Sequence, residues 1–318
     1  MGGKREAAPL IADTLLRASG GPWASYTEGF VGAGAVLLHV LSQRDKYFGE
    51  TRAPEVNLYE LDLGTCLFWQ SVAVWGKDPS RVVETTETTF NETMADLRAR
   101  NLTPRDAYAF VRAQYNEHAY LMQKGQVSTT AQFFAYWWIL RQTIFNGVWR
   151  VNKKGLCNST WSQRDPHLVS LFDREFVSAV AAVDVALHCT QCDLRSNFVP
   201  LIYQADQSVS TGGGGNGRHV AYFDPPYYGG EDKYASESWS AADHRHLIRD
   251  CAKLAGRGSV VGYSNHARPE VLEWVAAEVA TASGVSVFYT EILTRRSVSA
   301  KVKGRVPVPE GFWVFTTA

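Results

Sequence analysis

Long apolar runs are missing from this sequence. No stretch of its 318 residues approaches the 18 or so consecutive apolar residues that cross a bilayer, and the first six residues lack the apolar core of a signal peptide. We therefore expect a soluble, cytoplasmic protein with no membrane partner.

An excess of charge and a repeating cysteine pattern are missing as well. The 32 Lys and Arg balance 32 Asp and Glu, so no global field indicates a nucleic-acid partner and any basic surface must be local. Five Cys, an odd number, indicate reduced thiols and not a disulfide scaffold. Cys189 and Cys192 make half of a zinc site, but no second pair follows, so we expect no metal.

Short apolar runs alternate with helical patterns along most of the chain. In a chain that is 45% hydrophobic, this alternation predicts an α/β core. Strands are expected near residue 26 and at 56–60, 183–189, 219–223, 259–263, 285–290 and 312–316, of which the last two should pair. Helices are expected at 10–16, after Gly34, and at 85–100, 104–122, 132–145, 172–182, 242–255 and 270–280.

Four residues after the apolar run 219–223 carry the first functional signal. Asp224-Pro225-Pro226-Tyr227 stands at the carboxyl end of a predicted buried strand, where open α/β sheets bind ligands. The two prolines stiffen the turn and leave neighbouring carbonyls free to accept hydrogen bonds. A carboxylate beside an aromatic ring suits a flat heterocycle with an exocyclic amine; the alternative is an ordinary strand-ending turn.

A glycine turn near the amino terminus indicates a nucleoside cofactor. Gly32 and Gly34 permit a tight bend and close approach of a ligand between a strand and a helix. About 25 residues later a second strand ends in Glu60, where a carboxylate usually binds a ribose, with Asp62 as the other candidate. Lys4, after two glycines, can reach a carboxylate unless the terminus is flexible.

The middle of the chain changes character to helix. The helical patterns within 85–122 carry charge of both signs, and we assign them no chemical role. The aromatic-rich segment 132–145 is expected to belong to the core. Alternation around the turn at 152–155 predicts a hairpin. Residues 141–164 hold five Lys or Arg and no acid, as do residues 295–305. Such local basic groups suit a phosphate backbone, or are ordinary surface turns.

Together these residues resemble the Dam family, the D12 class of DNA adenine N6-methyltransferases, over nearly the whole chain. The resemblance rests on the order and spacing of the following segments: Gly2-Gly3-Lys4, Phe30-Val31-Gly32-Ala33-Gly34, the acid Glu60, Phe145-Asn146-Gly147 with the hairpin after it, Cys192-Asp193-Leu194, Asp224-Pro225-Pro226-Tyr227, Tyr263-Ser264-Asn265 and Arg296-Ser297-Val298-Ser299-Ala300. The chain departs from the family where Gly29 replaces a common proline and Glu60 replaces the usual Asp.

The resemblance implies a Rossmann-like core at residues 1–70 and 166–318, with a mostly parallel sheet that ends in an antiparallel hairpin. A mainly helical target-recognition insert with a β-hairpin would occupy 71–165. The implied reaction is site-specific methyl transfer from S-adenosylmethionine to N6 of a flipped-out adenine in double-stranded DNA, leaving S-adenosylhomocysteine, by a monomer or weak dimer without a metal. Alternatives are the same chemistry on cytosine N4, RNA adenine or a protein amine, or a DNA-binding homologue that has lost turnover.

Residue roles are implied by the same resemblance. The catalytic residues are Asp224, Pro225, Pro226 and Tyr227. The cofactor-binding residues are Gly3, Lys4, Phe30, Gly32, Ala33, Gly34, Glu60, Asp193, Leu194 and Asp224. The DNA-contacting residues are Arg141, Asn146, Arg150, Asn152, Lys153, Lys154, Asn158, Arg296 and Ser299. GATC is the family's usual recognition sequence, and restriction–modification, phage protection and regulation all stay open as biological roles.

Overall fold

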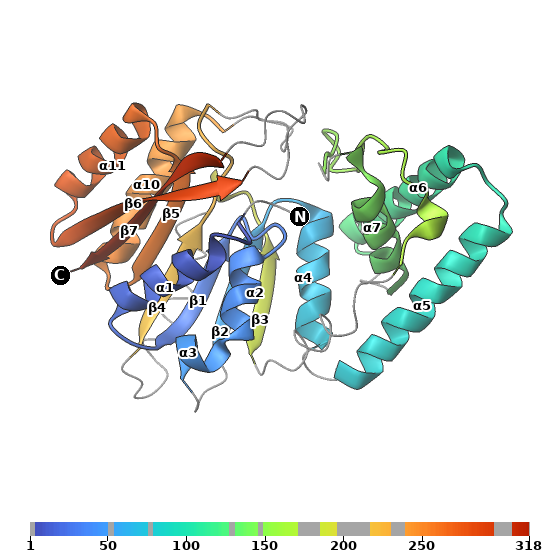
Figure 1. The fold of residues 1–318 in the computed structure, drawn as a ribbon, viewed down its shortest axis with the longest axis horizontal. Coiled ribbons are helices and arrows are strands. Elements are labelled where there is room, and N and C mark those ends of the chain that lie inside the picture. Colours follow the sequence, from blue (N-terminus) through green and yellow to red (C-terminus); the bar gives the residue numbers. More distant parts are fainter. Residues whose placement is uncertain are drawn as a thin grey trace.

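The centre of the protein is one twisted sheet with helices on both faces (Figure 1). The computed structural model describes residues 4–49, 54–75, 79–126, 131–145, 149–170, 185–195, 217–229, 239–295 and 307–317. Beyond the edge strand β3 a second group of helices stands beside the sheet, with α4 between the two (Figure 1).

The strands confirm the predicted sheet. They are β1 (Trp23–Gly29), β2 (Glu55–Glu60), β3 (Ala186–Gln191), β4 (Arg218–Phe223), β5 (Val260–His266), β6 (Val285–Arg295) and β7 (Pro307–Thr317), in the spatial order β3-β2-β1-β4-β5-β7-β6. The first five in this order are parallel, and β7 is antiparallel to both β5 and β6. The β6–β7 ladder runs on to the pair Arg295 and Pro307. It is longer than the apolar pattern predicted, because backbone pairing in a hairpin does not require apolar side chains.

The helices are α1 (Ala8–Ser19), α2 (Ala35–Ser42), α3 (Arg44–Phe48), α4 (Leu63–Trp75), α5 (Pro79–Ala99), α6 (Pro104–Gln123), α7 (Ala131–Thr143), α10 (Ala241–Gly256) and α11 (Pro269–Thr281), with a 3₁₀ turn at Pro166–Leu168. The short helix α3 was not expected. The helix predicted at 172–182 lies outside the described residues. No helix in the described ranges is long and apolar enough to span a membrane.

Alternating side chains of β4 build two cores. Val220 and Tyr222 point into a cluster that contains residues of α1 and α2, whereas Ala221 and Phe223 join a cluster with residues of α10 and α11. Because both faces of β4 are covered, every residue of the predicted strand 219–223 is buried. This explains why the sequence shows a continuous apolar run there instead of alternation.

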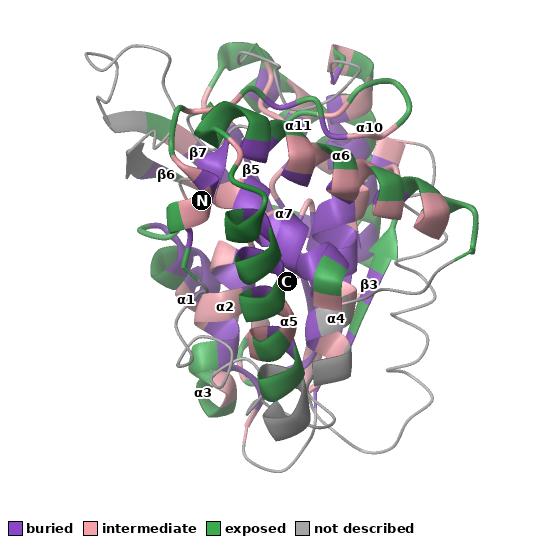
Figure 2. Ribbon diagram, turned by 90° about the vertical axis from the view of Figure 1, so that its right-hand side faces the viewer, coloured by how far each residue is buried: buried purple, intermediate pink, exposed green. Residues whose placement is uncertain are grey.

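The helices between residues 79 and 143 pack around α7. Its aromatic residues are buried, which confirms that this segment is core, and Figure 2 shows α7 at the buried centre while α5 turns an exposed face outward. The rings of Phe68 in α4 and Trp137 in α7 stack with centroids 4.8 Å apart. The aromatic core therefore continues from the sheet into this group of helices.

The hairpin predicted around the turn at 152–155 is present, with little ladder. Val151 and Cys157 form an isolated antiparallel bridge, and the Asn152 N–H donates to the Leu156 carbonyl at 2.8 Å. The Asn116 side chain of α6 bonds both backbone groups of Cys157. Its Oδ1 accepts the Cys157 N–H at 2.7 Å, and its Nδ2 donates to the Cys157 carbonyl at 3.0 Å. These side-chain bonds hold the turn against α6, while the Arg150 N–H bonds the Ser159 side chain in place of a backbone carbonyl.

Gly34 allows a close contact that we expect to limit substitution. It begins α2 with φ +66°, and a Cβ there would overlap the Trp69 ring. Gly125 has the same φ and open space around it. We predict that Gly125→Ala loses about 1 kcal/mol of unfolding free energy through left-handed strain, whereas Gly34→Ala loses about 1–3 kcal/mol more through overpacking. Urea unfolding of both variants measures the difference, and equal losses would contradict the contact.

Candidate active site

Asp224 follows β4 at the edge of the sheet where the parallel strands end. The last residue of β4, Phe223, is flanked by Gly29 of β1 and Tyr263 of β5. A Cβ at Gly29 would lie only 2.5 Å from the Phe223 ring, so the glycine lets the two strands close around this point. The carboxylate thus stands in the crevice where open α/β sheets bind ligands.

Asn265 holds the turn that contains Tyr227. Its Oδ1 accepts the backbone N–H groups of Tyr228 at 2.9 Å and of His266 at 2.8 Å. Its Nδ2 donates to the Tyr263 hydroxyl at 2.6 Å, and the Asn265 side chain is fully buried. The segment Tyr263-Ser264-Asn265 therefore positions the Asp224 turn.

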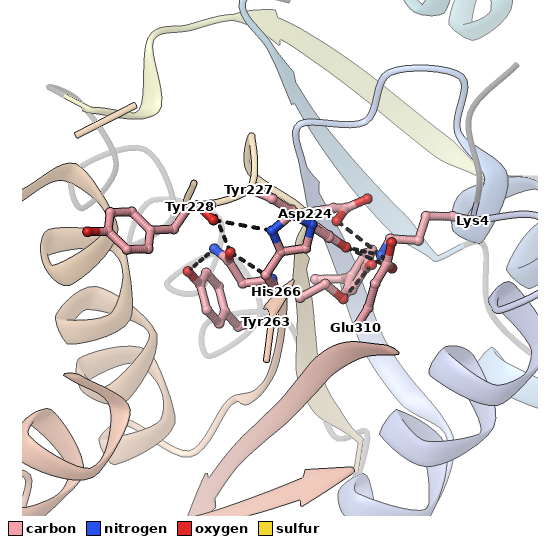
Figure 3. A network of polar contacts seen from close by, with 10 residues as sticks. Lys4, Asp224, Tyr227, Tyr228, Tyr263, His266 and Glu310 are labelled. Carbon is pink, nitrogen blue, oxygen red and sulfur yellow. Dashed lines mark hydrogen bonds and ion pairs between the residues drawn. The ribbon is translucent and has the colours of Figure 1, made fainter. Parts of the chain in front are cut away.

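A polar network surrounds Asp224 on its other side (Figure 3). Lys4 Nζ lies 3.3 Å from Asp224 Oδ1 and 2.6 Å from Glu310 Oε2, and it also bonds to the Tyr227 hydroxyl. That hydroxyl donates to Glu310 Oε2 at 3.0 Å. Oδ1 of Asp224 is buried, and its contact with the Lys4 ammonium at 3.3 Å is an ion pair outside hydrogen-bond geometry, so this oxygen keeps capacity to accept a hydrogen bond. The Lys4 ammonium thus pairs with two carboxylates, those of Asp224 and Glu310.

Burial dominates the electrostatics of this network. It raises the pKa of the Asp224 carboxyl; Lys4 opposes this increase, and the charge of Glu310 adds to it. Burial together with the two carboxylates raises the pKa of Tyr227 well above its ordinary value, so that this side chain stays a phenol. The Tyr227 ring meets the His266 ring edge-on, with centroids 4.9 Å apart.

A second acidic site lies at the ends of β1 and β2. Glu60 Oε2 accepts the Gly32 N–H at 2.8 Å, and Oε1 accepts the Asp62 N–H at 3.0 Å. Burial and the nearby Asp62 raise the pKa of Glu60 to about 7. The Trp69 indole N–H donates to the Gly32 carbonyl at 3.0 Å, so α4 fixes the same glycine turn.

The residues around this acid fit a nucleoside. Leu194 is buried in the same cluster as Phe223, and Phe30 meets the Trp239 ring edge-on at 5.1 Å. These apolar groups suit a purine ring, and the Glu60 carboxyl suits a ribose diol. Asp193 is bound to Arg195 by an ion pair of 2.6 Å.

A family model describes this chain. The D12 class N6 adenine-specific DNA methyltransferase model matches residues 1–287. The chain belongs to this family. Members transfer a methyl group to adenine N6 in DNA, and their chemistry implies S-adenosylmethionine as the donor. The family membership confirms the predicted enzyme class, and the mixed seven-stranded sheet with helices on both faces confirms the predicted α/β core.

Individual relatives are distant. The chain is 25% identical over 274 residues to the type II methyltransferase M.MjaIII of Methanocaldococcus jannaschii, covering 83% of this chain and 81% of that protein. Two solved structures of the rRNA methyltransferase aviRa from Streptomyces viridochromogenes align over 98% of this chain and 84% of theirs, with 12% identity and a TM-score of 0.38.

The predicted DNA-contacting residues of this methyltransferase divide into three groups. The side chains of Arg150, Asn152, Lys153, Lys154 and Asn158 are exposed on the hairpin. Arg141, by contrast, lies in α7 with its guanidinium 5.5 Å from the Trp149 ring, close to Asp62 and Glu60. Asn146, Arg296 and Ser299 lie outside the described residues, as does the predicted cofactor contact Gly3.

Sequence reasoning missed Glu310 and Trp149. Glu310 had one available signal, since it is the only acid after Glu291 and interrupts an otherwise apolar strand. Trp149 had none. Its indole N–H donates to Asp62 Oδ2 at 2.7 Å, while Asp62 Oδ1 accepts the Thr65 N–H at the start of α4. Asp62 thereby ties the head of the hairpin to the glycine turn.

Glu28 in β1 makes folding stability depend on pH. The side chain is buried, accepts the Tyr26 hydroxyl at 2.8 Å, and lies near Asp224; burial raises its pKa to about 8. The folded protein therefore holds a proton that the unfolded carboxyl releases near its ordinary pKa of 4.5. Between these values the folded state binds more protons, so its stability falls as pH rises.

We predict that Glu28→Gln abolishes this loss. Between pH 5 and pH 8 the unfolding free energy of wild type relative to Glu28→Gln should fall by about 3–5 kcal/mol. Urea unfolding across that range measures it. Glu278→Gln is the control, because Glu278 is a buried glutamate that is paired with Arg249 at 3.0 Å. The same pH slope in wild type and Glu28→Gln would show that Glu28 is ionised when folded.

We predict that Trp149→Phe loosens the hairpin. The substitution leaves the Asp62 carboxylate without its indole donor, and we expect about 1–3 kcal/mol less unfolding free energy. Trp161→Phe removes an indole N–H that donates to the Arg164 carbonyl at an exposed site, so its loss should be smaller. Thermal unfolding compares the two. Equal losses of stability would mean that the bond between Trp149 and Asp62 contributes nothing beyond the effect of replacing the larger ring with a smaller one.

Proposed function

We propose that this enzyme methylates, within a specific sequence, an adenine that has been flipped out of duplex DNA into the turn Asp224-Pro225-Pro226-Tyr227. One observation supports this most strongly. A buried acceptor oxygen on Asp224 and the Tyr227 ring stand together on a turn that the buried Asn265 side chain fixes. Adenine offers an amine to the first group and a ring face to the second.

In this proposal Asp224 and the Pro225 carbonyl accept the two hydrogens of the adenine amine. These bonds draw the nitrogen lone pair out of conjugation with the ring and aim it at the electrophilic methyl group that S-adenosylmethionine supplies. As the nitrogen–carbon bond forms and the carbon–sulfur bond breaks, positive charge moves to N6, and its proton leaves afterwards. Asp224 therefore need not be a strong base, and the rate comes mainly from alignment and electrostatics.

Tyr227 would stack on the flipped base, a contact worth about 1–3 kcal/mol by analogy with bases bound on aromatic side chains. Glu60 would hold the cofactor ribose, with Phe30 and Leu194 beside the purine. The glycine turn at Gly32 to Gly34 allows close approach between these groups. No metal is needed for any of these roles.

Residues 71–165 would act as the target-recognition insert. The exposed Lys153, Lys154 and Arg150 suit phosphate contacts, which position a protein on DNA, whereas Asn158 suits a base edge. Asn152 has a structural use already, since its Oδ1 accepts the N–H groups of Lys154 and Leu156. The type II relative makes restriction–modification the favoured context.

Asp224→Ala tests the assignment of the catalytic group. We predict that methyl transfer to DNA from labelled S-adenosylmethionine is abolished, while calorimetry shows cofactor affinity within a few-fold of wild type. Asp45→Ala, at an exposed aspartate of α3, controls for general effects. Turnover of Asp224→Ala near the wild-type rate would overturn the assignment.

Substrate and sequence require a second experiment. Duplex DNA, single-stranded DNA, RNA and a protein extract compete for the labelled methyl group, and single-molecule sequencing of plasmid from an expressing host locates the modified base. Transfer to cytosine, RNA or protein in preference to duplex DNA would contradict the proposal. A modified adenine within one repeated motif would identify the recognition sequence.

A further inference from the structure

Glu310 reaches the active site from the opposite end of the chain. It lies on β7, where its register partner on β5 is His266, the residue after Asn265. Its side chain is 15% exposed, and Oε2 accepts from both Lys4 and Tyr227 (Figure 3). The Asp224 mechanism uses none of these bonds, so they require another explanation.

The distances show which carboxylate binds the ammonium more closely. Lys4 Nζ is 2.6 Å from Glu310 and 3.3 Å from Asp224. A Lys4 paired with Asp224 alone would occupy the oxygen that must accept the adenine amine. It would also leave a neutral ion pair, with no net negative charge to stabilise a nitrogen that becomes positive during transfer, in a site of low dielectric constant where such charge matters most.

We propose that Glu310 is a positioning residue for methyl transfer: it holds Lys4 away from Asp224, compensates its charge, and fixes the hydroxyl of Tyr227. This inference rests on the proposed role of Asp224. With Glu310 present, Lys4 and the two carboxylates sum to one negative charge, which favours the cationic nitrogen. Tyr227 keeps its ring plane because Glu310 holds the hydroxyl while Asn265 holds the following backbone.

Glu310→Gln tests this role. The amide keeps the size of the side chain and one acceptor but removes the charge. We expect the single-turnover rate on duplex DNA to fall about 10- to 100-fold, with the affinities for DNA and S-adenosylhomocysteine within about threefold of wild type. Glu291→Gln is the matched control, because Glu291 is an exposed glutamate on the same β6–β7 hairpin. An unchanged rate, or equal losses in rate, affinity and melting temperature, would overturn the proposal.

A double substitution separates positioning from simple structural support. If Glu310 acts by controlling Lys4, then Glu310→Gln should cost much less in a Lys4→Met background than in wild type, and the two effects should not add. Additive effects would mean that Glu310 acts independently of Lys4 and would overturn this part of the proposal. Melting temperatures of all four proteins establish that each is folded.

The pH profile gives a readout that structural damage would not produce. Charged and titratable groups face Asp224 from every neighbouring element: Lys4, Glu28 of β1, Tyr222 of β4, Tyr227, Tyr263 of β5 and Glu310 of β7. Because the charge of Glu310 raises the pKa of Asp224, its removal should move the acid limb of the single-turnover rate to lower pH. If the acid limb of Glu310→Gln lies at the same pH as that of wild type, the proposal is contradicted.

These experiments distinguish two failures. If wild type transfers no methyl group to DNA, the proposed function fails, and the Glu310 inference, which rests on it, fails with it. If wild type is active and Glu310→Gln equals it, only the Glu310 inference fails.

Discussion

A single buried amide, the side chain of Asn265, determines where the turn at the candidate active site lies. Burying an amide is costly unless its donors and acceptor are bonded, and here the oxygen takes two backbone N–H groups while the nitrogen reaches the Tyr263 hydroxyl. The bonds join the end of β5 to the residue after Tyr227. Because β5 is held between β4 and β7, the turn inherits the rigidity of the sheet, as an aligned transfer reaction requires.

The sequence was informative wherever one local pattern decided the structure. Asp224 follows a short apolar strand and Glu60 ends an alternating one, and parallel strands bring such ends to one edge, so their location could be predicted without coordinates. Lys4 was expected to reach a carboxylate. Which carboxylate it reaches depends on how residue 4 lies relative to the end of β4, and the sequence does not show this. Glu310 could not be placed, because its partner on β5 is fixed by antiparallel register and no spacing in the sequence encodes it.

The hairpin shows a different limit of prediction. The pattern around Asn152 correctly indicated a turn, but the ladder is short: the Arg150 N–H bonds the Ser159 hydroxyl, and Asn116 of α6 bonds the backbone of Cys157. The mixed charge of α6 predicts no chemical role for this helix. Asp106 and Glu117 are exposed, yet other polar residues of α6 hold the basic segment. Tyr108 and Arg112 donate to the Ser159 carbonyl at 2.7 and 3.3 Å. The sequence of a charged helix does not show which of its polar side chains will bond to a neighbouring segment and which will face solvent.

A protein without net charge cannot rely on its overall field to orient DNA, so the position of the local basic turn relative to Asp224 must be fixed by contacts. The structure contains such contacts. Gly32 bonds Glu60, Glu60 bonds the Asp62 backbone, and the Asp62 carboxylate bonds Trp149 at the head of the hairpin. Each bond is 2.7–3.0 Å long. The glycine turn and the hairpin therefore share one frame, and a shift of either relative to the other requires breaking a partly buried bond to a carboxylate.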